Sequence, residues 1–177
     1  MKTVLIVAFS DTGNEAEALR QTLESFGLFV ATKYIGRPND FISVLRGEMP
    51  IDTDFIIFSC HGDDGKFIMP VLGENIYVPD EPKGNLGRED IEKFMHLSGK
   101  IILSLGCTTG TPETSRIFAK NNIYIAPIDY IEGRSALFFA IKFFYEVLQN
   151  GKDAKNAYEL AKANDAETAL FGFYAGV

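Results

Sequence analysis

The chain has 177 residues, a formal net charge of −7 at pH 7, two cysteines and two histidines. A negative charge balance disfavours nucleic acid or an anionic membrane as the main partner. The two cysteines are too few for a disulfide framework or a four-cysteine zinc site. We therefore expect one domain, spanning residues 1–177, that folds without a metal or other cofactor.

Apolar runs in the sequence are short. The run at residues 4–9 falls below the about 7–15 apolar residues of a secretory signal core. The later stretch at residues 136–148 contains Lys142 and Glu146 and is shorter than the about 18–20 residues of a membrane span. These patterns predict a cytoplasmic protein with reduced thiols and no membrane partner.

Strands and helices alternate through the first half of the sequence. Continuous apolar runs rich in β-branched residues indicate strands that are buried on both faces. Apolar residues spaced by three and four positions indicate a helix face. In chain order, these patterns predict a strand at residues 3–9, a helix at 14–26, a strand at 28–34, a short helix capped by Asn39 and a strand at 54–60.

The second half begins with two short apolar runs and a polar loop, and helices and strands then alternate again. Gly73 and Glu74 separate two short runs, which predicts a hairpin. In chain order, the segments are hairpin strands at residues 66–72 and 75–78, a polar loop at 79–87, a helix at 88–97, a strand at 100–105, a helix capped by Thr111, a strand at 122–126 and helices at 134–148 and 153–163. This order predicts an α/β sandwich with a mostly parallel central sheet and helices on both faces.

The predicted helix at residues 134–148 is apolar on nearly every side. A surface helix usually keeps a polar face, so this helix needs cover on more than one side. The following helix and residues 171–174 offer that cover within the monomer, and a homodimer or a partner protein is the alternative. We predict that Phe139 and Phe143 are more than about 90% buried within one chain.

A cysteine and a histidine follow two of the predicted strands. His61 and Cys107 each lie beside a glycine, at the edge of the sheet where α/β proteins place their chemistry. Neighbouring strands lie about 4.8 Å apart, so an imidazole and a thiol at adjacent strand ends can meet. The pair suits nucleophilic catalysis, with backbone amides near Gly62 and Cys107 as oxyanion donors. Cys60 alternates away from His61 and is predicted to be a core residue.

These segments resemble the two motifs of the caspase-like cysteine peptidases. Residues 58–62, Phe-Ser-Cys-His-Gly, and residues 101–110, Ile-Ile-Leu-Ser-Leu-Gly-Cys-Thr-Thr-Gly, are most similar to those of the CHAT family, which is related to separases. The likeness extends over roughly residues 50–165 and includes the apolar helix. The resemblance implies a flavodoxin-like sandwich, His61 as general acid and base, Cys107 as nucleophile, and the amides of Gly62 and Cys107 as the oxyanion hole.

Two departures leave another interpretation open. Gly106 stands where the family usually has alanine, and the helical-repeat regions that CHAT domains usually carry do not occur in these residues. The chain could therefore be a non-catalytic CHAT-like interaction subunit that serves a partner protein.

A third interpretation comes from the loop after the first strand. Residues 10–15, Ser-Asp-Thr-Gly-Asn-Glu, resemble the phosphate loop of flavodoxins, which binds FMN. Free amides at a helix N-terminus suit a phosphate group. The same residues also suit an ordinary polar turn that caps a helix, so the loop by itself does not decide between the folds' functions.

Carboxylates near the predicted strand ends suggest a substrate preference. Asp63 and Asp64 follow His61, and Asp129 and Glu132 follow the fifth large strand. These carboxylates could line a pocket for a basic side chain of a protein or peptide substrate, with Asp129 as the best single candidate, so the sequence favours cleavage after arginine or lysine.

Overall fold

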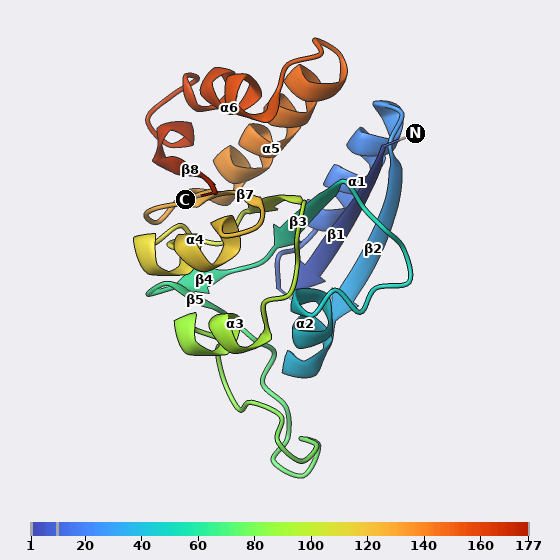
Figure 1. Ribbon diagram of the computed structural model, residues 1–177, viewed down its shortest axis with the longest axis vertical. Helices are drawn as coiled ribbons and strands as arrows, with labels where there is room; N and C mark the ends of the chain where they lie inside the picture. The colour runs from blue at the N-terminus through green and yellow to red at the C-terminus, as the bar shows by residue number, and fades with distance from the viewer. Residues whose placement is uncertain (1, 10, 177) are drawn as a thin grey trace.

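The computed structural model describes residues 2–9 and 11–176 of the chain. Its main sheet has six strands in the order β2–β1–β3–β6–β7–β8, and β8 alone runs antiparallel to its neighbour (Figure 1). The first five positions match the order of flavodoxin-like sheets. The bounds are β1 Thr3–Phe9, β2 Phe29–Ile35, β3 Phe55–Ser59, β6 Ile101–Ser104, β7 Ile123–Pro127 and β8 Phe171–Ala175.

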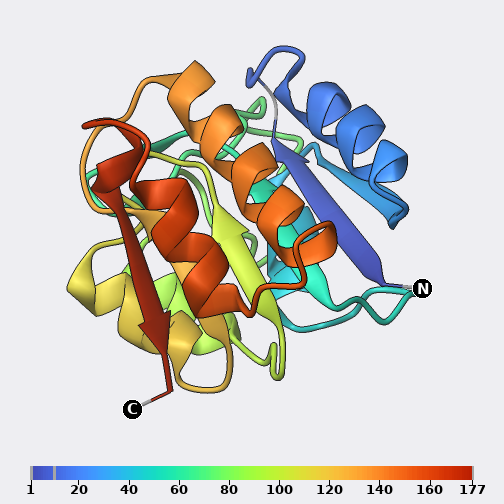
Figure 2. The ribbon, with the colours of Figure 1, turned by 90° about the horizontal axis from the view of Figure 1, so that it is seen from above.

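Helices cover both faces of this sheet, as the sequence predicts (Figure 1). One face packs against α1 (Glu15–Ser25), α5 (Gly133–Leu148) and α6 (Ala154–Lys162), which lie side by side over the sheet in Figure 2. The other face packs against α2 (Pro38–Leu45), α3 (Arg88–Phe94) and α4 (Pro112–Ala119). The α/β class with a mostly parallel central sheet is therefore confirmed.

The apolar helix α5 is covered within the monomer. Phe139 and Phe143 are both fully buried, which confirms the predicted burial. The Phe139 ring stacks on Phe171 with ring centroids 3.7 Å apart, and α6 packs along the same helix. Residues 171–174, predicted as a tail, belong to β8 and extend the sheet beyond β7.

The hairpin predicted around Gly73 is wrong. In this region, the short strands β4 (Gly62–Asp63) and β5 (Lys66–Phe67) pair, Phe67 also forms a bridge with Leu86, and residues 68–85 leave the body as an irregular loop (Figure 1). The carboxylate of Glu81, buried in the structure, accepts hydrogen bonds from the Arg37 guanidinium and the Val78 amide. These bonds hold the loop in a path that a regular hairpin does not follow.

Of the two predicted helix caps, Thr111 is confirmed as the N-cap residue of α4, and Asn39 differs from the structure. Helix α2 begins at Pro38 with Arg37 as its N-cap, because proline fits the first helical position. Asn39 therefore lies inside the helix, and its amide donates to Glu81. Thr111 does precede α4, but its side chain makes no capping hydrogen bond.

Helix length bears on the membrane prediction. Among the helices formed by the described residues, none is both long enough and apolar enough to cross a bilayer.

Candidate active site

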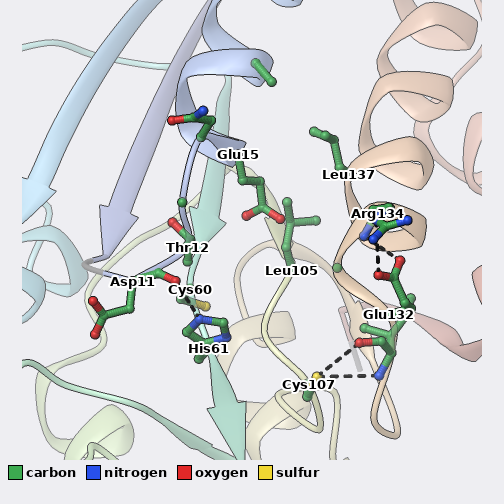
Figure 3. Close-up of a pocket in the computed structure, with 15 residues that line it drawn as sticks. Asp11, Thr12, Glu15, Cys60, His61, Leu105, Cys107, Glu132, Arg134 and Leu137 are labelled. Atoms are coloured by element: carbon green, nitrogen blue, oxygen red, sulfur yellow. Dashed lines mark hydrogen bonds and ion pairs between the residues drawn. The ribbon is translucent and has the colours of Figure 1, made fainter.

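A cavity of about 530 Å³ opens at the carboxyl ends of the parallel strands (Figure 3). Its walls come from residues 11–15 after β1, from Cys60 and His61 after β3, from Leu105 and Cys107 after β6, and from residues 131–134 before and within α5. Sheets with this strand order bind ligands at the same edge, where the order of the strands reverses. The loops after β1 and β3 meet at that reversal point.

The structure brings His61 and Cys107 to neighbouring strand ends. β3 and β6 are parallel neighbours, and Phe58 is the register partner of Ser104. His61 and Cys107 each follow three residues after this pair, and both side chains line the cavity (Figure 3). The described residues show no direct hydrogen bond between the two side chains, a separation common in enzymes without substrate.

The imidazole of His61 is oriented by the loop after β1. Its Nε2 lies 3.0 Å from the backbone oxygen of Asp11. A carbonyl oxygen only accepts hydrogen bonds, so Nε2 carries the proton and donates it to that bond. Nδ1 is then the nitrogen with the free lone pair in the neutral ring, and this nitrogen can act as a base.

Backbone groups surround the half-buried thiol of Cys107. Its Sγ lies 3.4 Å from the amide nitrogen of Ile131, whose N–H can donate to sulfur. The turn after Cys107 is fixed to β7 and the loop that follows it by two further bonds, from the Thr108 amide to the Asp129 carbonyl and from the Gly110 amide to the Pro127 carbonyl. The nucleophile candidate therefore sits on a turn fixed by backbone hydrogen bonds, with its sulfur beside both the amide and the carbonyl oxygen of Ile131.

Cys60 lies in a different environment. It packs in the hydrophobic cluster on the α2, α3 and α4 side of the sheet, whereas Cys107 packs against the cluster on the α1 and α5 side. Burial raises the pKa of the Cys60 thiol to about 12, and the Ser104 hydroxyl 3.8 Å away opposes this rise only in part. The prediction that Cys60 is a core residue is confirmed.

The predicted oxyanion donors have distinct surroundings. The Cys107 amide donates to no group among the described residues, so it is free for a ligand. Gly62 packs tightly against the same turn: a Cβ added to Gly62 would lie 2.1 Å from the Cys107 carbonyl oxygen. Gly62 is absent from the residues described as lining the cavity, and its role as a donor stays a prediction.

Two of the predicted specificity carboxylates, Asp63 and Asp129, lie outside the described lining of the cavity. Asp63 accepts a hydrogen bond from the Tyr130 hydroxyl, and the Asp129 carboxylate accepts one from the Tyr130 amide. Both side chains are exposed. Asp129 contributes to the site through its backbone, which holds the turn that carries Cys107.

The acidic groups that line the cavity are Asp11, Glu15 and Glu132, with Arg134 as the lining cation. In the sequence, Asp11 and Glu15 belong to the segment that resembles a phosphate loop, whereas Glu132 is one of the strand-end carboxylates predicted to bind a basic side chain. Their signal in the sequence is their position directly after β1 and β7, at the edge where His61 and Cys107 also lie.

The loop after β1 has an unfavourable electrostatic environment for phosphate. Ser10 of the proposed phosphate motif lies outside the described residues, and Asp11, Thr12, Gly13 and Asn14 line the cavity. Glu15 presents its carboxylate to the same space (Figure 3). Two carboxylates next to the loop would repel a phosphate dianion.

Residues 2–9 and 11–176 contain no cluster of three or more histidine, cysteine, aspartate or glutamate side chains placed to hold a metal ion.

No protein-family model matches the chain, and no curated protein matches it in sequence.

Proposed function

We propose that the protein is a caspase-like cysteine endopeptidase in which Cys107 is the nucleophile and His61 the general acid and base. The observation that carries this proposal is the matched position of the two residues, three positions past a register pair on adjacent parallel strands, with both side chains on one open cavity. The CHAT-like motifs at residues 58–62 and 101–110 support the same assignment.

The reaction follows from the groups around the cavity. Nδ1 of His61 accepts the proton of the Cys107 thiol, and Sγ attacks the carbonyl carbon of the scissile peptide bond. The amides of Cys107 and Gly62 donate to the oxyanion that forms. The imidazolium then protonates the leaving amine as the C–N bond breaks. Water, deprotonated by His61, hydrolyses the resulting thioester and releases the acid product and the free thiol.

A basic substrate side chain suits the charges of the cavity. Asp11, Glu15 and Glu132 line it together with the single lining cation Arg134, which pairs with Glu132 across 3.6 Å. Such an excess of carboxylates attracts a cationic group. The preference for arginine or lysine in the substrate therefore stays part of the proposal, with these carboxylates in place of Asp63 and Asp129.

A peptide-library cleavage assay tests the proposal. The wild-type chain should cleave after basic residues, and Cys107→Ala and His61→Ala should each lower kcat/KM by at least about 10³-fold. Cys60→Ala is the matched control and should retain cleavage, because the buried Cys60 thiol stays protonated, with its pKa raised to about 12, and packs in the hydrophobic cluster under α2, α3 and α4. No cleavage of any library by the folded wild-type chain would contradict the proposal and favour the non-catalytic subunit.

A further inference from the structure

Glu15 has no assigned step in the proposed reaction, although its side chain is part of the cavity. It is the first residue of α1, and its carboxylate points into the cavity that His61 also lines (Figure 3). The hydroxyl of Ser59, a fully buried residue, donates a hydrogen bond of 2.6 Å to its Oε1. The carboxylate is therefore fixed in place instead of moving freely in solvent.

The loop at residues 11–15 holds the end of β3 at two points. Ser59 bonds to Glu15 and, across 3.2 Å, to the Thr12 hydroxyl. Two residues later, His61 donates to the Asp11 carbonyl across 3.0 Å. Residues 59 and 61 share one side of an extended chain because side chains alternate along it. The same loop thus forms hydrogen bonds with Ser59, at the end of β3, and with the imidazole of His61.

Asp11 has a backbone conformation that suits this contact. Its φ of 75° lies in the left-handed region, which aspartate tolerates better than most residues. The turn so formed directs the Asp11 carbonyl oxygen to the His61 ring. The segment that resembles a phosphate loop therefore serves the histidine.

Charge couples the two side chains as well. Burial raises the pKa of the Glu15 carboxyl, while the Ser59 hydrogen bond and the positive charge of the His61 imidazolium lower it. An electrostatic interaction between two sites is mutual. If the imidazolium favours the carboxylate of Glu15, that carboxylate favours the imidazolium to the same extent.

We propose that Glu15 is a positioning residue for His61: its carboxylate, held by Ser59, stabilises the imidazolium form of the ring that the Asp11 carbonyl orients. This inference rests on the proposed function, because an imidazolium forms when His61 takes the Cys107 proton. The charge of the His61 imidazolium is then stabilised by Glu15, which lies outside the two CHAT-like motifs at residues 58–62 and 101–110.

Other charged or titratable groups also face His61. The Asp11 side chain is exposed. Glu132 pairs with Arg134 at the opposite wall of the cavity, so the charges of Glu132 and Arg134 largely offset one another. Cys107 lies on the neighbouring strand end, and the thiol of Cys60 stays protonated because burial raises its pKa to about 12. Glu15 is thus the partly buried carboxyl group on this part of the cavity wall, held in place by Ser59.

The two-histidine composition makes this inference measurable by NMR. His61 and His96 should give two imidazole titration curves, which His96→Gln assigns. In Glu15→Gln, the midpoint of the His61 curve should move to lower pH, because the stabilising negative charge is lost. Glu17→Gln removes an equal charge from the exposed side of the same helix and should leave the His61 curve in place.

A His61 curve that is the same within about 0.2 pH unit in the wild type and in folded Glu15→Gln would overturn the inference. A measurement on the wild type covers the case in which this variant does not fold. The side-chain carboxyl carbon of Glu15 should then show a second step at the His61 midpoint, as coupled sites do, and a single step would overturn the inference. Neither measurement uses peptide cleavage, so loss of the proposed function and loss of this coupling are separate results.

Discussion

The two cysteines follow neighbouring strands at the same edge of the sheet, and their environments differ. Cys60 follows β3 and packs in the hydrophobic cluster under α2, α3 and α4, and its raised pKa keeps it protonated. Cys107 follows β6 on the side of α1 and α5, half-buried in the cavity wall with the Ile131 amide beside its sulfur. The alternation of side chains along a strand and one turn of backbone therefore separate the inert thiol of Cys60 from the accessible thiol of Cys107.

The difference depends on how closely the two strand ends approach. Gly62, directly after the histidine, packs against the carbonyl of Cys107 at a distance that leaves no room for a side chain. The turn after Cys107 is held from the other side by the backbone of β7 and its following loop. The half-buried thiol of Cys107 therefore sits on a turn that is held from both sides, as the proposed alignment of a nucleophile with a base requires.

Gly62→Ala should have the largest effect on this comparison. The new Cβ would lie 2.1 Å from the Cys107 carbonyl oxygen, a backbone atom that moves only with the whole turn. We expect a loss of about 3 kcal/mol in the free energy of unfolding and slower alkylation of Cys107. Urea denaturation measures the first quantity, and mass spectrometry after brief exposure to iodoacetamide measures the second.

Gly133→Ala is the control for that substitution. An added Cβ meets no atom within 4 Å there, so stability should change by less than about 0.5 kcal/mol. If Gly62→Ala were as stable as Gly133→Ala, the close contact between the two strand ends would be refuted.

Alkaline pH should affect the buried cysteine through stability. Burial raises the pKa of Cys60 from 9.0 to about 12, so above pH 9 the native state keeps a proton that the unfolded state releases. The free energy of unfolding should therefore fall as pH rises from 9 to 12, by up to about 1.4 kcal/mol per pH unit. Thermal denaturation across this range measures the slope.

Burial also raises the pKa of Tyr124, which adds to the same alkaline slope. The part due to Cys60 is isolated by a variant: the slope for Cys60→Ala should be less steep than that of the wild type. Equal slopes in the two proteins would show that Cys60 is not the buried thiol described.

The strand ends were predictable because their signals are local. Runs of β-branched apolar residues locate β1, β3, β6 and β7, and the glycines after them mark where the chain leaves the sheet. His61 and Cys107 follow directly from that pattern, as does the burial of Cys60 by alternation.

The parts that the sequence did not reveal depend on contacts between distant residues. Glu81 lies in a stretch that the sequence predicts to be a polar loop. Its side chain is buried because it pairs with Arg37, 44 positions away. Glu15 acquires its fixed carboxylate from Ser59, also 44 positions away, and the local motif indicated phosphate instead. β8 exists as a strand because β7 supplies its hydrogen-bond partners.

The alkylation rates of the two thiols at neutral pH test the central claim most directly. Brief exposure to iodoacetamide followed by peptide mass spectrometry should find Cys107 labelled well before Cys60, because Cys107 faces an open cavity beside His61 while Cys60 is buried with a pKa of about 12. His61→Ala should slow the labelling of Cys107 by about tenfold, since the proposed base is gone. Earlier labelling of Cys60, or an unchanged rate at Cys107 in His61→Ala, would contradict the account.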